Sequence, residues 1–232
     1  MAKTFTKIGK EITIAVKQGG PDVVGNSRLR ALMAEARSEN MPKDNVEKAI
    51  KRALEKNQGD FKEVVFEGYG PHGIAYLVET ATDNNARTVA NVRSYFTKCG
   101  GSLGTSGSVS FMFDHKCVFR IKYQEGMDID ELQLALCECD DDPEVFIEEQ
   151  EDKDENITKN VVIYGAYESY GAIQKYIEDN GYELVSGGFE RIPNVDLKDV
   201  TPEQRETLDK LTGLLEDDDD VTNVYSTLKP AE

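Results

Sequence analysis

The residues best suited to chemistry in this sequence are cations gathered near its amino terminus. Eleven of them fall on the expected outer faces of three predicted helices: Lys3, Lys7, Lys10, Lys17, Arg28, Arg30, Arg37, Lys43, Lys48, Lys51 and Arg52. Ammonium and guanidinium groups at such spacings suit contact with successive phosphates of a nucleic-acid backbone. No aromatic side chain is interleaved in these basic faces, so the pattern predicts phosphate contact and not base stacking.

Charge is segregated along the chain. Residues 1–58 carry twelve Lys/Arg against seven Asp/Glu, whereas residues 59–232 carry fifteen against thirty-seven, and the net charge is −17. An acidic chain is repelled by nucleic acid on average, but only the local field matters within a Debye length of about 8–10 Å. The sequence therefore predicts a basic head on an acidic body.

Apolar periodicity predicts the first helix of the head. Apolar side chains recur at helical spacing from Phe5 to Val16, and the lysines of this segment fall on the opposite side. Ile14 lies among those lysines and is expected to be exposed. Gln18-Gly19-Gly20-Pro21 should end the helix, because Gly and Pro break the hydrogen-bond ladder. For a single helix, an ordinary solvated face is the alternative explanation of the lysines.

Two further helices have recognisable ends. The second should begin near Asn26 or Ser27 and stop around Asn40. The segment 40–45, Asn-Met-Pro-Lys-Asp-Asn, is then predicted to cap the third, since Asn can accept a hydrogen bond and Pro is tolerated in the first turn. The three helices together have the size and charge of small nucleic-acid-binding modules.

Beyond residue 59 the pattern changes to alternating strands and helices. Strands are predicted around 64–66 and 74–78, a helix at 86–98, and a further strand from Val109 to Phe113. From 118 to 185 the predicted order is strand, helix, strand, strand, helix, strand, as in a ferredoxin-like unit. The tail echoes half of this order, because a helix, an Asp cluster and a strand occur in both places.

We therefore expect an α+β protein with a small amino-terminal helical bundle followed by two α/β (ferredoxin-like) domains, the second inserted in the first. The expected boundaries are 1–58 for the basic three-helix domain, 59–116 plus 190–232 for the first α/β domain, and 117–189 for the inserted acidic domain. No stretch is apolar enough to span a membrane and no secretory signal is legible, so a cytoplasmic protein without a membrane partner is expected.

Three other patterns could carry chemistry, and each has a simpler explanation. The glycine-rich segment 100–107 lacks the Gly-Lys-Ser/Thr of a nucleotide-binding loop, so a tight loop is expected. The eleven carboxylates between Glu138 and Glu155 should be solvated, with a surface for a basic protein or a weak metal site as alternatives. Four cysteines and two histidines show no metal or nucleophile spacing, so we expect no enzyme, no metal and no cofactor.

Several co-linear motifs resemble those of the YebC/PmpR family. They are Phe5-Thr6-Lys7, the segment 40–45, Glu67-Gly68-Tyr69-Gly70-Pro71, Thr82-Asp83-Asn84, the glycine-rich segment 100–109, and Asp218-Asp219-Asp220-Val221-x-Asn223-Val224-Tyr225. The family includes bacterial probable transcriptional regulators and the mitochondrial translational activator of cytochrome c oxidase. The resemblance implies a helical amino-terminal domain, two α/β domains, no enzymatic activity, and either DNA binding or ribosome association.

The sequence departs from the family pattern in two places. It begins close to Phe5-Thr6-Lys7, without the Gly-His-Ser-Lys-Trp-rich basic segment that usually precedes this motif, and it has His72 where Gly is common. Without that segment we expect weaker phosphate binding by the head than is typical of the family.

Three functional hypotheses follow from these observations. The first is a regulator of gene expression whose head binds nucleic acid, either DNA in transcription or ribosomal RNA on the ribosome. The second is a protein-interaction module whose acidic domains bind basic proteins while the head folds back on the body. The third, a metal-dependent phosphoesterase that uses the carboxylate run, ranks last.

Overall fold

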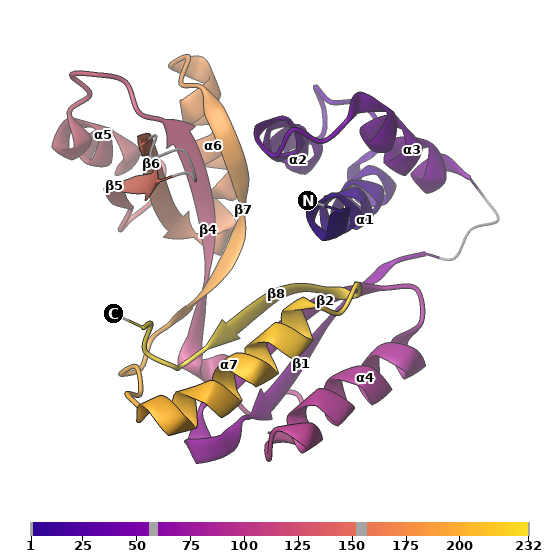
Figure 1. The fold of residues 1–232 in the computed structure, drawn as a ribbon. Helices are drawn as coiled ribbons and strands as arrows, with labels where there is room; N and C mark the ends of the chain where they lie inside the picture. Colours follow the sequence, from indigo (N-terminus) through magenta and orange to yellow (C-terminus); the bar gives the residue numbers. More distant parts are fainter. Residues whose placement is uncertain (1, 56–59, 152–156, 232) are drawn as a thin grey trace. The chain divides into compact units, whose positions relative to one another are not determined.

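The structure, a computed structural model, describes residues 2–55, 60–151 and 157–231. Three helices come first (Figure 1): α1 (Ala2–Gly19), α2 (Ser27–Ser38) and α3 (Lys43–Leu54). Asn26 caps α2, because its side-chain oxygen accepts a hydrogen bond from the Leu29 amide at 3.0 Å. The predicted end of α1 and start of α2 are therefore confirmed.

Asn40 has one of the two roles predicted for it, at the end of the second helix, and not the other, as cap of the third. It does not cap α3 but ends α2, with a φ of +57°. The amides of Asn40 and Met41 donate to the carbonyls of Arg37 and Ala36, at 3.0 and 2.8 Å. This is the hydrogen-bond pattern that closes a helix when a left-handed residue follows it, and Asn tolerates that conformation better than most residues.

The exposure predicted for Ile14 is wrong. Ile14 is buried, with 5 % of its surface exposed, as are its four nearest neighbours Ile12, Thr13, Ala15 and Val16. Five consecutive residues at about 100° each point around the whole helix, so this turn of α1 is covered on every side. The apolar pattern of one helix does not show whether other parts of the chain pack against the face that carries its lysines.

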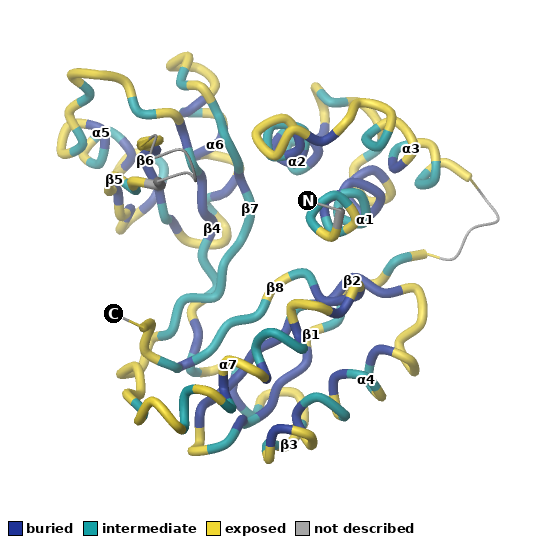
Figure 2. The backbone as a smooth tube through the Cα atoms, viewed as in Figure 1, coloured by how far each residue is buried: buried dark blue, intermediate teal, exposed yellow. Residues whose placement is uncertain are grey.

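The first sheet is antiparallel, with strand order β3–β1–β2–β8. Its strands are β1 (Lys62–Tyr69), β2 (Ala75–Thr82), β3 (Ser102–Leu103) and β8 (Val221–Ser226). Two helices, α4 (Asn85–Lys98) and α7 (Pro202–Glu216), cover one face, where Phe96 and Leu211 pack against Tyr76. A smaller cluster around Leu77 and Phe113 lies on the other face. Nearly all of β2 is buried (Figure 2), and this strand lies between β1 and β8.

The second sheet has the order β5–β6–β4–β7. Its strands are β4 (Phe113–Lys122), β5 (Glu144–Glu151), β6 (Ile157–Ala166) and β7 (Leu184–Pro193), connected through α5 (Ile129–Leu136) and α6 (Tyr170–Asp179). The chain order is β-α-β-β-α-β with β4 and β6 in the middle, as in the ferredoxin-like arrangement. Phe119, Ile163 and Ile177 lie at the centre of its core. This sheet is inserted in the first, because its strands lie between β3 and α7 in the chain.

The fold is α+β, as predicted: a three-helix region and then two antiparallel four-stranded sheets with helices. Two compact units can be distinguished, one made of Met1–Ile14, Lys51–Asp114 and Arg191–Glu232, the other of Ala15–Ile50 and His115–Glu190. The predicted boundary at 58/59 lies outside the described residues. The three domain ranges given above stay a prediction.

The strand predicted from Val109 to Phe113 is wrong. Ser110–Met112 form a short 3-10 turn, and β4 begins only at Phe113. The amides of Val109 and Ser110 donate to the carboxylate of Glu67, at 2.7 and 2.8 Å. These backbone donors are therefore not available to a sheet, whatever the strand propensity of the side chains.

His72 lies in the turn between β1 and β2 with a φ of +62°, a conformation that costs a residue with a Cβ more than it costs Gly. We expect His72→Gly to raise the free energy of unfolding by about 0.5–1 kcal/mol, after the larger entropy of Gly in the unfolded chain is subtracted. Urea unfolding measures the change. Asn40→Gly, at φ +57°, is the control and should gain less, because Asn tolerates this conformation. A loss of stability in His72→Gly would contradict the argument.

Candidate nucleic-acid interface

The eleven predicted phosphate contacts separate into three groups. The cations of the first group lie on α1 and contact a segment near the carboxyl terminus: Lys3, Lys7 and Lys10. Those of the second lie near polar or aromatic partners or have other contacts: Lys17, Arg28, Arg30 and Arg52. Those of the third are exposed and make no ion pair with any residue that the structure describes: Arg37, Lys43, Lys48 and Lys51.

The first group contacts residues 216–220, Glu-Asp-Asp-Asp-Asp, which we call the Asp loop. Lys3 Nζ lies 2.5 Å from Asp217 Oδ1, and Lys7 Nζ donates to the Glu216 carbonyl at 3.3 Å. Burial lowers the pKa of Lys7, and the nearby Glu216 charge opposes this effect. The lysines predicted opposite the apolar stripe of α1 therefore include a row, Lys3, Lys7 and Lys10, which we call the lysine row, but this row faces carboxylates and carbonyls of the same chain.

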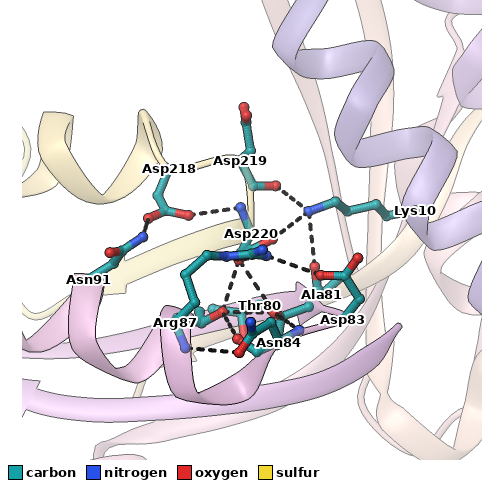
Figure 3. Close-up of polar contacts among 12 residues, drawn as sticks. Lys10, Thr80, Ala81, Asp83, Asn84, Arg87, Asn91, Asp218, Asp219 and Asp220 are labelled. Atoms are coloured by element: carbon teal, nitrogen blue, oxygen red, sulfur yellow. Dashed lines mark hydrogen bonds and ion pairs between the residues drawn. The ribbon is translucent and has the colours of Figure 1, made fainter. Parts of the chain in front are cut away.

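Lys10 is the most deeply placed member of the row. Its ammonium group donates to the carbonyls of Asp219 and Ala81, at 2.7 and 3.2 Å, and pairs with Asp220 Oδ1 at 2.8 Å (Figure 3). An ammonium group has three donors, and these contacts use all of them. With its side chain only 11 % exposed, Lys10 has a structural role and is not a surface contact for phosphate.

Asp220 is the centre of this polar cluster and is 4 % exposed. Its Oδ2 accepts a hydrogen bond from Arg87 Nη2 at 2.7 Å (Figure 3). The same oxygen accepts from Thr88 Oγ1 at 2.9 Å and from Thr82 Oγ1 at 3.3 Å. Thr82 ends β2 and the other two donors lie in the first turn of α4, so one strand-to-helix turn positions all three. Burial alone would raise the pKa of the Asp220 carboxyl, but hydrogen bonds from Lys10, Arg87 and Thr88 together hold it below its usual value.

Asp218 organises the turn that leads to Asp220. Its Oδ1 accepts the Asp220 amide at 2.9 Å, and its Oδ2 accepts Asn91 Nδ2 at 3.0 Å and the Tyr95 hydroxyl at 2.9 Å. Burial, followed by the bond to Asp218, raises the pKa of Tyr95 to about 12. The Asp loop is therefore held on α4 by side-chain hydrogen bonds as well as by its own backbone.

The Asp cluster that follows α5 in the second sheet has the same local hydrogen bond as the Asp loop. Asp140 Oδ1 accepts the Asp142 amide at 3.0 Å, just as Asp218 accepts that of Asp220 two residues on. Each aspartate follows a helix, α5 or α7, and precedes a strand, β5 or β8. The two turns differ in their surroundings, because Asp140 Oδ2 accepts the Ala166 amide whereas Asp218 Oδ2 accepts the side chains of Asn91 and Tyr95.

A cavity of about 520 Å³ opens beside the Asp loop within the first unit. Arg52 of α3 lines it, with its guanidinium carbon 4.3 Å from the ring centre of Phe61 and Nη2 3.8 Å from Asp83. Arg87 and Lys10 line it as well. The three cations are outnumbered by the carboxylates of Asp83 and the Asp loop, so this cavity is a poor site for a free phosphate.

The remaining cations of the second group are held by nearby groups. Arg30 pairs with Glu178 at 2.8 Å and donates to the carbonyls of Val23 and Val24, at 2.9 and 2.6 Å. Arg28 donates to the side chain of Gln18 at 3.1 Å. Arg30 therefore fixes the turn before α2, and its guanidinium group has little capacity left for a phosphate.

The glycine-rich segment is a tight loop, as predicted, and its amides already hold an anion. Glu67, 5 % exposed on β1, accepts the amides of Gly107, Val109 and Ser110 at 2.7–2.8 Å. Burial would raise the pKa of the Glu67 carboxyl, but these backbone donors outweigh burial and lower it. A carboxylate of the same chain thus occupies the position that a phosphate would need in a nucleotide-binding loop.

The acidic run is only partly solvated. Asp140 is buried, contrary to expectation, because the amides of Ala166 and Asp142 satisfy its carboxylate. Three glutamates of β5 form ion pairs with cations of β4 and β6: Glu144 with Lys116, Glu148 with Arg120, and Glu149 with Lys159. Residues 152–155 of the run lie outside the described part of the chain.

Sequence reasoning missed the residues that organise these sites. Asp220, Arg87 and Glu67 were not singled out as members of any site, although each lies in or beside a motif shared with the family. Among the described residues, no group of three His, Cys, Asp or Glu side chains could hold a metal ion, and no helix is long and apolar enough to cross a membrane. The four cysteines are unpaired.

Comparison with known proteins gives consistent matches over nearly the whole chain. A family model of the second and third domains of TACO1/YebC proteins matches residues 61–228, and one of the N-terminal domain matches residues 1–56. A Parabacteroides distasonis protein is 58 % identical over 229 residues, covering 99 % of this chain and 90 % of the relative. One from Bacteroides thetaiotaomicron is 56 % identical over 232 residues, covering 100 % and 91 %. Both are named probable transcriptional regulatory proteins.

A solved structure supports the same assignment. The crystal structure of a conserved hypothetical protein from Aquifex aeolicus superposes with a TM-score of 0.79 at 32 % identity, covering 100 % of this chain and 91 % of that one. The two family models, the identity to the relatives and the shared fold agree with the motifs found in the sequence. The chain belongs to the TACO1/YebC family.

Proposed function

We propose that this chain is a non-enzymatic regulator of gene expression that binds nucleic acid, as a DNA-binding transcriptional regulator of the YebC type. The observation that carries the proposal is the third group of cations: Arg37 at the end of α2, and Lys43, Lys48 and Lys51 on α3. They are exposed and form no ion pair within the described residues. They all fall within residues 37–51, whereas other exposed cations that form no ion pair within the described residues, such as Lys62, Arg93 and Lys175, are spread through the acidic remainder of the chain.

The position of Lys43 strengthens this point. Lys43 is the first residue of α3, where a positive charge opposes the helix dipole and contributes nothing to helix stability. A cation at such a position is better explained by an external anion than by the helix itself. The names of the relatives, which describe probable transcriptional regulatory proteins, support a nucleic-acid target in general.

The test compares two variants that lose the same charge. Arg37→Gln/Lys43→Gln/Lys48→Gln/Lys51→Gln removes the third group, and Arg93→Gln/Lys62→Gln/Lys175→Gln/Lys210→Gln removes four exposed cations elsewhere. We expect the first to weaken binding of duplex DNA at least about tenfold and to reduce the slope of log K against log salt by about three to four. The second should change both far less. Equal losses, or binding that does not depend on salt, would refute the proposal.

A ribosome-associated factor that contacts ribosomal RNA is the second candidate. It is favoured by the acidic remainder of the chain, fifteen Lys/Arg against thirty-seven Asp/Glu in residues 59–232, which opposes wrapping on a long duplex. Acidic domains suit a site that is also rich in basic proteins. Co-sedimentation of the same variants with ribosomes at two salt concentrations, beside the DNA shift, distinguishes the two targets.

A tempting alternative test would mislead. Replacing Lys3, Lys7, Lys10 and Lys17 together with Gln removes the lysine row but also takes one of the cationic partners away from Asp220, which is buried. Loss of nucleic-acid binding in that variant could then come from a disturbed first unit. The third group avoids this problem, because its members have no described ion-pair partner to lose.

A further inference from the structure

We propose that the Asp loop competes with nucleic-acid phosphates for Lys3 and Lys7, so that the protein covers part of its own binding surface. The inference rests on the proposed function and adds a means of regulating it. Two of the cations that the sequence presents as phosphate contacts are already held by a carboxylate and a carbonyl of the same chain. Nucleic acid would have to displace the loop to reach them.

The ion pair between Lys3 and Asp217 resembles a contact between a lysine and a phosphate. Asp217 Oδ1 pairs with Lys3 Nζ, and a phosphate oxygen would bind the same ammonium group through the same kind of charge-assisted hydrogen bond. Lys3 lies in the first turn of α1, which contains no acidic residue, so the helix dipole and the lysine attract an anion together. Asp217 supplies that anion, and the bond to Lys3 in turn holds the pKa of the Asp217 carboxyl below its usual value.

The contact is weak enough to be reversible. The side chains of Lys3 and Asp217 are 54 % and 73 % exposed, and ion pairs between such exposed groups contribute little and are screened by salt. A polyanion that offers several phosphates at once can displace a single exposed carboxylate. Lys10 stays in place, because its three contacts and its burial fix it to Asp220 and the adjacent carbonyls. Release therefore concerns Lys3 and Lys7 alone.

The echo of the Asp loop provides a matched control. Asp141 and Asp142 follow α5 in a turn with the same local hydrogen bond, are exposed, and form no ion pair with a described residue. Glu216→Gln/Asp217→Asn and Asp141→Asn/Asp142→Asn each remove two negative charges. Only the first pair lies against the lysine row. Any difference between the two variants therefore reports the competition and not the change in net charge.

The experiment measures binding of a short labelled duplex DNA and of a single-stranded RNA of equal length as salt is varied. We expect Glu216→Gln/Asp217→Asn to tighten binding about two- to fivefold over the control variant and to steepen the salt slope by about one, because Lys3 loses its carboxylate partner while the Glu216 carbonyl that accepts from Lys7 is kept. Equal affinities and slopes in the two variants would overturn the competition.

A second measurement does not use nucleic acid. Acetylation of lysine amines by a mild reagent, read by mass spectrometry, should be slower at Lys3 and Lys7 than at Lys43 and Lys48 in the unaltered protein. Glu216→Gln/Asp217→Asn should speed it at Lys3, whose partner is the substituted Asp217 side chain, and an unchanged rate there would show that the loop does not cover Lys3. If acetylation becomes faster but no variant binds nucleic acid, the proposed function is wrong, and the competition between the Asp loop and phosphates is wrong with it. The contact between the Asp loop and Lys3 would still be supported.

Discussion

Replacing Asp220 with alanine is expected to lower the free energy of unfolding by about 3–5 kcal/mol. The substitution leaves the ammonium group of Lys10 without its carboxylate in a place where it is 11 % exposed, and it removes the acceptor shared by Arg87 and Thr88. Buried charges cost far more when unpaired than a buried pair contributes. Urea unfolding at neutral pH measures the loss.

The neighbouring Asp219 provides the control. Its side chain is exposed, and it holds Lys10 only through its main-chain carbonyl, which alanine keeps. We therefore expect Asp219→Ala to change the free energy of unfolding by less than about 0.5 kcal/mol. Similar losses in the two variants would mean that net charge, and not the buried cluster, determines stability.

The cluster around Asp220 should also make the stability of the protein depend on pH in the acidic range. The folded-state pKa of Asp220 lies below its value in the unfolded chain, about 3.9. Its stabilising contribution is therefore complete above that value and is lost as pH falls through the folded-state pKa. Urea unfolding midpoints measured as a function of pH test this. The midpoint of the unaltered protein should fall below about pH 4, and that of Asp220→Ala should fall less steeply.

Much of the fold follows from local patterns in the sequence. The Asn26 cap, the Gly-Pro end of α1 and the β-α-β-β-α-β order of the second sheet all depend on residues close together in the chain, and the structure confirms them. The Asp echo was legible for the same reason, because each copy is a helix, a turn and a strand in succession. Local rules fail where a residue's partner is distant.

The lysine row shows this failure most clearly. Helical periodicity places Lys3, Lys7 and Lys10 opposite the apolar stripe, which is the usual position of a solvated face. Their actual partners lie about 210 residues away in sequence, at 216–220. No pattern within one helix can indicate that its polar face meets a distant carboxylate. For the same reason the sequence could not rank the eleven cations, and only the structure separates the paired from the unpaired ones.

The conformation after the glycine-rich loop was also beyond local patterns, because the Glu67 carboxylate that fixes it lies about 40 residues earlier in the chain. This carboxylate provides the second large prediction. We expect Glu67→Gln to lower the free energy of unfolding by about 2–4 kcal/mol. The carboxylate accepts three backbone amides, from Gly107, Val109 and Ser110, and an amide side chain has only one acceptor oxygen to replace two. Glu63→Gln, exposed on the same strand, is the control and should cost much less.

The pH dependence of this loop has a defined sign. The pKa of Glu67 is lowered in the folded state, so its contribution is present above the ordinary value of about 4.3 and is lost in more acidic solution. Hydrogen exchange of the amides of Gly107, Val109 and Ser110 follows the loss residue by residue. In Glu67→Gln these three amides should exchange faster than in the unaltered protein, whereas the amides of β2, which bond to the backbones of β1 and β8, should keep their protection. Unchanged protection would mean that the loop is held by its backbone alone, and that Glu67 does not set the conformation that replaces the predicted strand.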